Sequence, residues 1–247
     1  MIAFSGGVDS SLVAAMAVQA LGERAIAVTA VSETLGGREL EDAKRIATEI
    51  GIRHELVSFS ELADVRFVRN DASRCFFCQS MRFDQLQQLA DQLGCAVLAS
   101  GTNWDDTQDH RPGLKAMADR RVYQPLLEHR ITKNEVRALA REAGLSAWDK
   151  PAKACLSSRI PHGTAVTERR LRRIERAEDV LDDFGFRQFR VRDHDGLARI
   201  EVGTDEVGRL VELVDDIAPL VRAAGFRDVE VDRAGYRSGS LNPRTSP

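Results

Sequence analysis

The sequence lacks the features of a membrane protein, of a disulfide-rich secreted domain and of a dedicated nucleic-acid binder. Its apolar runs are far shorter than the roughly 20 residues that cross a bilayer. Its four cysteines, with no recognisable secretory leader, are too few for a disulfide framework in 247 residues, so we expect reduced thiols. The net charge of −3 gives no excess of Lys and Arg for phosphate backbones. We therefore expect a cytoplasmic chain with small-molecule partners, and neither a membrane nor a nucleic acid among them.

Lysine is also scarce, since only five of the 35 basic residues are lysines. Arginine suits bidentate binding of phosphates and carboxylates, although genome composition alone can produce the same bias. The rest of the composition, 43% hydrophobic and 30% charged, is that of a globular chain. Its length allows one large domain, or one domain with a small companion.

The first half alternates short apolar runs with segments of helical periodicity. We expect strands at 2–4, 25–32, 54–59 and 95–99, and helices at 9–21, 40–50 and 86–93. The run at 95–99 is continuous, which predicts a central parallel strand covered on both faces. The alternation as a whole predicts an α/β fold with a doubly wound, mostly parallel sheet.

The pattern changes after a predicted helix in the middle of the chain. Residues 132–135 have the spacing of a capping box, which opens a helix that Gly144 closes. A loop rich in small and polar residues then runs from 146 to 167. We place the domain boundary there, between domains of residues 1–148 and 149–247. The second is predicted to be a smaller α+β domain, with helices at 171–184 and 210–221, a hairpin turning at Asp195-Gly196 and a strand at 229–231.

The segment Ser5-Gly6-Gly7-Val8-Asp9-Ser10-Ser11 lies between the first predicted strand and a helix. Its glycines permit backbone turns in which consecutive N–H groups converge on an anion at the helix N-terminus. It lacks the Gly-Lys-Ser/Thr ending of the Walker loop, in which lysine assists terminal phosphoryl transfer, so cleavage at an α-phosphate fits better. The alternative is a plain glycine turn.

The same segment matches the PP-loop signature. That resemblance implies release of pyrophosphate from ATP and transfer of AMP to a substrate. The candidate ATP-binding residues are Ser5, Gly6, Gly7, Asp9, Ser10 and Ser11. Asp9 is also a candidate ligand for Mg²⁺, a hard cation that prefers oxygen ligands. The motif therefore places the first predicted domain among ATP-binding domains of the PP-loop type.

Three of the cysteines form a second feature. Cys75-Phe76-Phe77-Cys78 is compatible with a redox pair, half a zinc site, two ligands of an iron–sulfur cluster or two buried thiols. Cys155 lies in a loop with cationic neighbours. Three thiolates around a [4Fe-4S] cluster leave one iron free to carry an extra sulfide, whereas zinc normally takes a fourth ligand. In the alternative, the first two cysteines only pack and Cys155 acts alone. Cys95, inside an apolar run, is expected in the core.

Longer segments make the resemblance closer than the superfamily. They are Arg74-Cys75-x-x-Cys78, Gly101-Thr102-Asn103 with Asp106, Asp109 and Arg111-Pro112-Gly113, Trp148-Asp149-Lys150-Pro151, Ala154-Cys155-Leu156-x-Ser158-Arg159-Ile160-Pro161, Ala198-Arg199-Ile200-Glu201-Val202 and Gly235-Tyr236-Arg237-Ser238-Gly239-Ser240. In this order they cover nearly the whole chain, and together they resemble the LarE family. The sequence departs from the family pattern at Gln79, where lysine is expected, and at Trp104, where a small residue is usual.

Resemblance to LarE implies an ATP-dependent sulfur transferase that makes the nickel-pincer nucleotide cofactor of lactate racemase and related enzymes. The implied substrate is pyridinium-3,5-biscarboxylic acid mononucleotide, whose carboxylates are adenylated and then converted to thiocarboxylates. In that family the cysteine matching Cys155 carries the sulfur. It is either sacrificed to dehydroalanine or, where an additional Cys-x-x-Cys is present, acts as a cluster ligand. This sequence has that pair, so we favour a [4Fe-4S] cluster held by Cys75, Cys78 and Cys155.

The resemblance also implies a substrate site, a homo-oligomer, and a sulfur donor and cofactor-pathway enzymes as candidate partners. A nucleotide with one phosphate and two carboxylates needs cations in fixed positions, for which Arg forks are well shaped. Arg190 and Arg192 share one face of the strand expected at 188–193, with a solvated strand face as the alternative. Glu201 would orient an arginine or merely pair on the surface. The candidate substrate-binding residues are Ser158, Arg159, Arg190, Arg192, Glu201 and Arg237.

Asp106, Asp109 and Arg111 follow the strand expected at 95–99. Because ligands of open α/β sheets gather at the carboxyl ends of the strands, we expect these side chains to serve ATP, Mg²⁺ or the substrate.

Other classes of protein would use the same phosphate loop. Several tRNA-thiolating enzymes combine a PP-loop with cysteines or a cluster, but the acidic balance of this chain and the lack of an added RNA-binding domain count against that function. NAD or GMP synthetase chemistry would use the loop for amidation and does not call for three thiols. A nucleotide-binding regulator without catalysis would not need them either.

Overall fold

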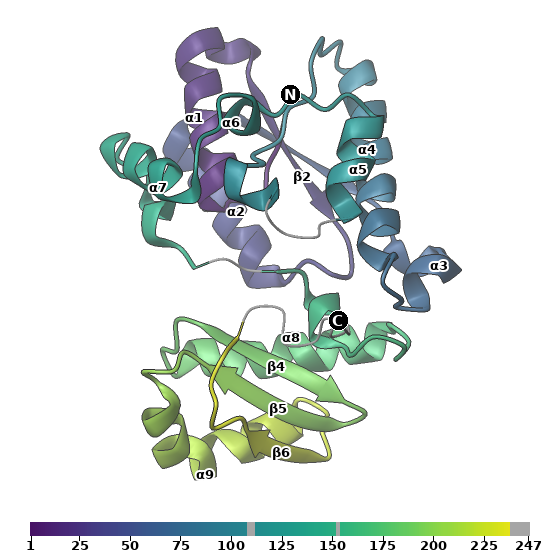
Figure 1. Ribbon diagram of the computed structural model, residues 1–247, viewed down its shortest axis with the longest axis vertical. Helices are drawn as coiled ribbons and strands as arrows, with labels where there is room; N and C mark the ends of the chain where they lie inside the picture. Colours follow the sequence, from purple (N-terminus) through teal and green to yellow (C-terminus); the bar gives the residue numbers. More distant parts are fainter. Residues whose placement is uncertain (108–111, 152–153, 238–247) are drawn as a thin grey trace, which may run out of the picture. The chain divides into compact units, whose positions relative to one another are not determined.

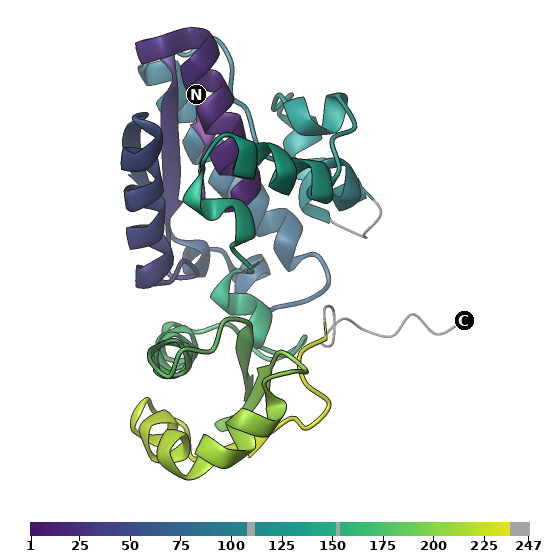
Figure 2. The same cartoon turned by 90° about the vertical axis from the view of Figure 1, so that its left-hand side faces the viewer.

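The computed structural model describes residues 1–107, 112–151 and 154–237, which gather into two compact units (Figures 1 and 2). Unit 1 comprises Met1–Ala63 and Ser73–Lys153, and unit 2 comprises Asp64–Ala72 and Ala154–Pro247. The chain therefore passes between the units three times. Among the described helices, none combines the length and the apolar composition needed to cross a membrane.

Unit 1 is built on a parallel sheet. Strands β1 (Ile2–Ala3), β2 (Ile26–Val31) and β3 (Arg53–Ser58) pair in the order β1-β2-β3, with Ile2 opposite Ala27 and Ala27 opposite His54. The helices of this unit are α1 (Val8–Leu21), α2 (Gly37–Ile50), α4 (Arg74–Gln92), α5 (Pro112–Asp119), α6 (Pro125–Glu128) and α7 (Lys133–Glu142). The capping box predicted for α7 is present. The Thr132 side chain accepts a hydrogen bond from the backbone N–H of Glu135, and the Glu135 side chain accepts one from the backbone N–H of Thr132.

Alternate side chains of β2 enter two separate apolar cores. Ala27 packs with residues of α1, α2 and α7, whereas Ile26, Val28 and Ala30 pack with residues of α4 and α5. Because successive side chains of a strand point to opposite faces, the sheet is covered on both faces. In Figure 1, α1, α2 and α7 accordingly lie on one side of β2 and α4 and α5 on the other. This confirms the predicted α/β class with a doubly wound sheet.

The strand expected at 95–99 is the main error in this unit. Ala99 forms two isolated parallel bridges, to Ile2 and to Tyr123, and residues 95–98 lie outside any strand. Val97 is 51% exposed, so the run is not covered on both faces. A short apolar run has no periodicity to show how much of it pairs with a neighbour. Ala99 still extends the sheet on the other side of β1.

Unit 2 is a three-stranded sheet with two long helices. Strands β4 (Phe189–His194) and β5 (Leu197–Val202) are antiparallel, while β5 and β6 (Asp228–Val231) are parallel. Asp195 and Gly196 turn the predicted hairpin with φ angles of 53° and 94°, the positive values that a two-residue turn requires. The unit also contains α3 (Val65–Val68), α8 (Glu168–Asp183), α9 (Val207–Ala223) and the short turn η5 (Leu156–Arg159). The smaller α+β architecture is thereby confirmed.

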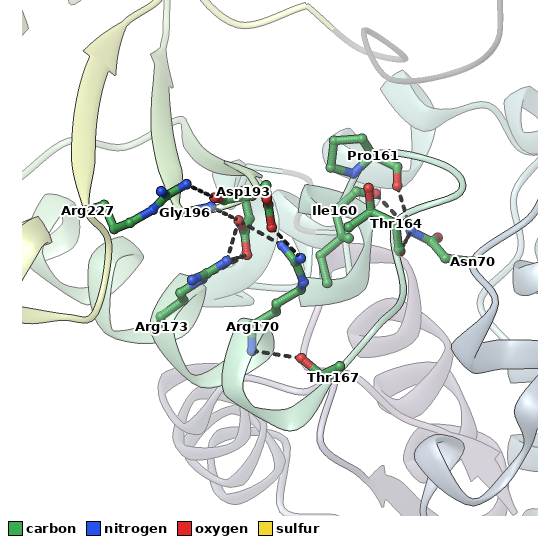
Figure 3. A network of polar contacts seen from close by, with 11 residues as sticks. Asn70, Ile160, Pro161, Thr164, Thr167, Arg170, Arg173, Asp193, Gly196 and Arg227 are labelled. Carbon is green, nitrogen blue, oxygen red and sulfur yellow. Dashed lines mark hydrogen bonds and ion pairs between the residues drawn. The ribbon is translucent and has the colours of Figure 1, made fainter.

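A set of hydrogen bonds around Asn70 ties the segment 64–72 into unit 2. Asn70 is fully buried, adopts a φ of 57°, and accepts at its own carbonyl from the backbone N–H of Gly163 at 3.0 Å. Its Nδ2 donates to three carbonyl oxygens, those of Ile160 (3.3 Å), Pro161 (2.8 Å) and Thr164 (2.7 Å). Figure 3 shows the Asn70 side chain pointing into this loop. We call this arrangement the Asn70 latch. The boundary between functional domains at 148 and 149 stays a prediction.

Candidate active site

The phosphate loop lies at the point of the sheet where the order of the strands reverses. β1 has β2 on one side and Ala99 on the other, so the loops that follow β1 and Ala99 emerge next to each other. Such a switch point is where open α/β sheets bind their ligands. The loop after Ala99 approaches α1 so closely that a Cβ on Gly101 would lie 2.7 Å from the backbone nitrogen of Ser10. Two loops predicted from separate motifs are thus brought together.

The loop itself is folded tightly around the start of α1. Gly6 has a φ of 67°, and a Cβ there would lie 2.7 Å from Cα of Ala43 in α2, so only glycine fits. Ser10 Oγ donates to the carbonyl of Gly7 at 3.1 Å and lies 3.3 Å from Ser5 Oγ. Ser11 is fully buried, and its hydroxyl has no hydrogen-bond partner among the described residues. The helix N-terminus adds the positive end of the α1 dipole, which favours an anion at this loop.

Asp9 is held between a side-chain amide and an ammonium group. Its Oδ1 accepts from Asn103 Nδ2 at 3.0 Å, and its Oδ2 accepts from Lys133 Nζ at 2.5 Å. Asn103 is 2% exposed and is fixed in turn, because its Oδ1 accepts from the backbone N–H groups of Asp105 and Asp106. Asp9 therefore has a defined orientation at the phosphate loop.

Two lysines at this site were missed as functional residues by the sequence analysis. The sequence pattern places Lys133 in a capping box, and Lys150 in a family segment and among the cationic neighbours of Cys155, but assigns neither of them to the phosphate loop. Lys150 Nζ lies 2.8 Å from Asp42 Oδ2 and 3.3 Å from the carbonyl oxygen of Gly6. The scarcity of lysine was the available signal, since two of the five lysines meet the same loop. Asp109 and Arg111, the other candidates near this site, lie outside the described residues.

Cys75 and Cys78 lie near the start of α4, about one turn apart. Cys75 is exposed, whereas Cys78 is 6% exposed and donates its S–H to Oε1 of Glu61 at 3.4 Å. Each sulfur has a guanidinium neighbour, because Arg74 Nη2 and Arg82 Nη2 lie 3.9 Å from Cys75 Sγ and Cys78 Sγ respectively. Residues at i and i+3 share one face of a helix, so the pair can serve as a two-thiol unit.

Cys155, in unit 2, directly precedes η5 and is partly buried. Its Sγ lies 3.1 Å from Ser157 Oγ. The loop is braced by Arg159, whose Nη1 donates to the carbonyls of Ala154 and Cys155 and to Ser158 Oγ. Arg159 is 1% exposed and forms a bidentate ion pair with Glu178, in which Nε donates to Oε1 and Nη2 to Oε2, each at 2.8 Å. Arg159 Nη1 therefore holds the loop that carries Cys155, while Nε and Nη2 pair with Glu178.

Arg190 and Arg192 are both buried, so the alternative of a solvated strand face is wrong. Arg192 pairs with Glu201 at 2.8 Å and donates to the carbonyl of Ser158 at 3.0 Å, which links β4 to the Cys155 loop. The Arg190 guanidinium stacks 5.1 Å from the ring centroid of Tyr236. Burial lowers the pKa of Arg190, and the nearby charge of Arg159 lowers it further. The local excess of positive charge favours an anionic ligand.

The remaining predicted residues differ in how deeply they are buried. Glu201 is buried beside Arg192, as an orienting carboxylate would be, and Ser158 is partly buried. Arg237 is exposed and 3.9 Å from Asp232. No three His, Cys, Asp or Glu side chains among the described residues are arranged to hold a metal ion. Mg²⁺ that arrives with ATP needs only one or two protein carboxylates, and Asp9 has one carboxylate at the phosphate loop.

Comparison with known proteins agrees with this geometry. The asparagine synthase family matches residues 2–74, the part that contains the phosphate loop. An uncharacterized protein of Synechocystis sp. is 45% identical over 98% of this chain and 91% of its own length. The pyridinium-3,5-bisthiocarboxylic acid mononucleotide synthase of Lactiplantibacillus plantarum is 36% identical over 98% of this chain and 88% of its own. The tRNA-specific 2-thiouridylase MnmA of Rickettsia felis is 29% identical, over 61% of this chain and 51% of its own.

Fold, phosphate loop and relatives together define an ATP-dependent, sulfur-transferring enzyme of the PP-loop type. The match to the Lactiplantibacillus synthase extends over nearly the whole of both chains, whereas the match to the thiouridylase is partial. The chain belongs to the LarE family, that of the pyridinium-3,5-bisthiocarboxylic acid mononucleotide synthases.

Proposed function

We propose that this enzyme adenylates the carboxylates of pyridinium-3,5-biscarboxylic acid mononucleotide and converts them to thiocarboxylates, for the nickel-pincer nucleotide cofactor. The observation that carries the proposal is the 36% identity to the named synthase over nearly the full length of both proteins. The tightly folded phosphate loop beside Asp9 supports the ATP-dependent step. The three thiols support the sulfur-dependent step.

In the first step a substrate carboxylate oxygen attacks the α-phosphorus of ATP, a P–O bond forms, and pyrophosphate leaves. The backbone N–H groups of the phosphate loop and the N-terminus of α1 bind the departing phosphates. We propose that Asp9 holds Mg²⁺ with phosphate oxygens as co-ligands, and that Lys133 neutralises charge on the pyrophosphate. The step is needed because a carboxylate has only oxide or hydroxide to expel, whereas an acyl adenylate expels AMP.

In the second step a sulfur nucleophile attacks the activated acyl carbon, so that a C–S bond forms, the acyl C–O bond breaks and AMP leaves. We propose that Cys75, Cys78 and Cys155 hold a [4Fe-4S] cluster for this step. Two thiols one helical turn apart, each with a guanidinium neighbour, suit thiolate ligands. When bound, the cluster would supply an iron with an open position for an additional sulfide. The hydrogen bonds from Arg159 to the carbonyls of Ala154 and Cys155 would hold Cys155 at a fixed place in its loop.

The substrate's anionic groups need cations that are already in place. Arg192 is oriented by Glu201, Arg190 is buried against Tyr236, and Ser158 lies on the same loop as Cys155. Charge-assisted hydrogen bonds from such pre-oriented groups are stronger than those from mobile surface arginines. We propose Ser158, Arg159, Arg190, Arg192, Glu201 and Arg237 as the substrate site, with Arg159 and Glu201 acting mainly by positioning.

The test combines cluster analysis with substrate dependence. Iron, acid-labile sulfide and the visible spectrum would be measured after anaerobic purification of wild type and of Cys75→Ala, Cys78→Ala and Cys155→Ala, with Cys95→Ala as the matched control. We expect about four irons per chain, lost in the first three variants and retained in the control. A wild type without iron even after reconstitution would overturn the cluster and leave Cys155 as a sacrificial donor.

Pyrophosphate release tests the substrate independently of the cluster. We expect release from ATP that depends on the pyridinium dicarboxylate nucleotide. Release that depends on tRNA instead would overturn the proposal in favour of tRNA thiolation, and ATP binding without turnover would favour a regulatory protein. A homo-oligomer, a sulfur donor and partner enzymes of the cofactor pathway stay predictions.

A further inference from the structure

Lys150 approaches the phosphate loop from a different part of unit 1 than Lys133 does. Its ammonium lies 2.8 Å from Asp42 Oδ2 in α2 and 3.3 Å from the carbonyl oxygen of Gly6. The side chain is only 17% exposed, so the charge is largely removed from water. An ammonium has three N–H donors, and these two acceptors are its contacts within the described part of the chain.

The backbone of Lys150 is fixed to its surroundings. Arg137, in α7, donates from Nη1 to the carbonyl of Trp148 at 2.7 Å and from Nη2 to the carbonyl of Lys150 at 3.0 Å. Four residues earlier, the backbone N–H of Ser146 donates to Glu49 in α2 at 2.7 Å. The lysine therefore projects from a rigid base, which reduces the entropy lost when its side chain binds a ligand.

The contacts of Lys150 are of the kind that an anion would replace. The Gly6 carbonyl belongs to the loop whose N–H groups are arranged for phosphate, so the ammonium already lies beside that position. A neutral carbonyl is a weaker partner for an ammonium than a phosphate oxygen. Burial opposes ionisation of Asp42, but the hydrogen bonds and charges of Lys150 and Arg45 outweigh it and lower the pKa of that carboxyl. Asp42 is thus a carboxylate counter-ion for the lysine.

We propose that Lys150 binds the β- and γ-phosphates of ATP, and that Asp42 is its counter-ion when no phosphate is bound. This inference rests on the proposed function to the extent that it takes the loop to bind ATP. It identifies a second lysine for the triphosphate, five residues before the cysteine that is proposed to handle sulfur. Arg137 acts as a positioning residue for it.

The test is the affinity of Lys150→Met for three ligands, measured by calorimetry: an α,β-methylene ATP analogue with Mg²⁺, pyrophosphate, and AMP. We expect affinity for the analogue and for pyrophosphate to fall about 10- to 100-fold, and affinity for AMP to change less than about 3-fold. Lys150→Arg should recover part of the loss. Lys115→Met, which removes an exposed lysine of the same unit, is the matched control and should bind like wild type.

Asp42→Asn separates phosphate binding from a structural role. If Asp42 is a counter-ion that competes with phosphate, this variant should bind the analogue at least as tightly as wild type. If the pair only holds α2 to the segment before Pro151, both variants should weaken all three ligands equally, and that result would overturn the inference. Unchanged binding of the analogue by Lys150→Met would overturn it as well.

The outcome is distinguishable from failure of the proposed function, because the binding experiment contains neither dicarboxylate nor sulfur donor. Wild type that binds the analogue but releases no pyrophosphate with the dicarboxylate would contradict the proposed function and leave the assignment of Lys150 intact. Wild type that does not bind the analogue would overturn both.

Discussion

At the scale of single residues, we propose Asp9 as the side chain on which the ATP-dependent step depends most. Its two oxygens are held by Asn103 and Lys133, so its position is set before the nucleotide binds. We expect Asp9→Asn to lower dicarboxylate-dependent pyrophosphate release by roughly 100-fold, because the variant loses a pre-oriented charge at the reacting phosphates. The ion pair with Lys133 is partly exposed, so the free energy of unfolding should fall by less than about 1 kcal/mol.

Asp119→Asn is the matched control, since Asp119 pairs with Lys115 on the exposed side of α5. It should keep wild-type turnover. A turnover loss in Asp9→Asn that only parallels a large loss of stability would contradict the assigned role.

His54 should make the stability of unit 1 depend on pH. Thr29 Oγ1 donates its only hydrogen to the carbonyl of Phe4 at 2.8 Å, so it must accept from Nε2–H of His54, also at 2.8 Å. Burial lowers the pKa of His54 below its ordinary value of 6.5. The positive charge of Lys44 lowers this pKa further, and the negative charge of Glu55 only partly offsets the decrease. The unfolded chain then binds more protons below pH 6.5, so this contribution to stability is present above that pH and is lost as the pH falls.

His54→Gln keeps an N–H donor for Thr29 but does not titrate. We expect its urea midpoint to fall less than that of wild type between pH 7.5 and pH 5.5. Equal decreases in the two proteins would show that His54 does not contribute to the pH dependence.

At the scale of elements, the close approach of the loop after Ala99 to α1 can be tested at Gly101. A Cβ there would meet the backbone of Ser10 and Asp9 at 2.7 to 2.9 Å, and backbone atoms cannot move aside as a side chain can. We expect Gly101→Ala to displace the loop, weaken binding of the ATP analogue at least 10-fold, and cost about 1–3 kcal/mol of stability. Calorimetry and urea unfolding would measure the two effects.

Gly208→Ala, in α9, is the control for adding a methyl group. Nothing lies within 4 Å of its Cβ position, so this variant should gain about 0.5–1 kcal/mol from the better helix propensity of alanine. Similar effects of the two substitutions would contradict the close approach at Gly101.

The Asn70 latch predicts a large loss of stability in unit 2. Asn70→Ala leaves three carbonyl oxygens without their hydrogen-bond donor. It also puts alanine at a positive φ, where its Cβ is strained and no polar side chain compensates. Together these effects should lower the free energy of unfolding by roughly 3 kcal/mol. Asn70→Gly loses the same bonds without the steric penalty and should be about 1 kcal/mol less harmful. Urea unfolding would measure both, and hydrogen exchange at Gly163 should become faster.

Asn134→Ala, on the exposed side of α7, is the control and should change stability by less than about 0.5 kcal/mol. If Asn70→Ala were equally mild, the latch would not hold the segment 64–72 in unit 2.

The predictable elements are those whose signals are local. The helix at 133–142 follows from a capping box and a closing glycine, and the hairpin at 195–196 follows from an Asp-Gly pair, so both were predicted correctly. The prediction of a strand at 95–99 was wrong because the pairing of these residues depends on neighbours across the sheet. The same distinction applies to the site. The glycines and cysteines can be recognised from their spacing in the sequence, whereas the contact of Lys133 with Asp9 joins residues 124 positions apart and has no local pattern.

At the scale of the whole molecule, the sequence gives no sign that 64–72 belongs with residues far beyond it. The tie is made by one asparagine side chain and a few backbone bonds, none of which has a pattern that periodicity can detect. Burial of Arg190 and Arg192 is equally non-local, because their partners come from β5, from η5 and from the segment after β6. Contacts of this kind require the fold before they can be recognised.

Each of the two compact units carries its own candidate binding residues, so we expect each substrate to protect a different set of amides. A ligand at 100 times its Kd stabilises the form that binds it by about 2.7 kcal/mol, which slows exchange of amides that open only when the site is disrupted. With the Mg²⁺-bound ATP analogue we expect protection at 5–11, 101–106 and 132–133 in unit 1. With the dicarboxylate nucleotide alone we expect it at 156–160 and 190–192 in unit 2.

Hydrogen exchange measured by mass spectrometry resolves these segments, and Arg192→Leu supplies the control. That variant should lose the protection caused by the dicarboxylate nucleotide and keep the protection caused by the analogue, because Arg192 contacts Glu201 and Ser158, which both lie in unit 2. Protection of 190–192 by the analogue in the absence of the dicarboxylate would instead assign the buried arginines to ATP. The substrate would then have to be bound elsewhere, and the assignment of the two sites would be reversed.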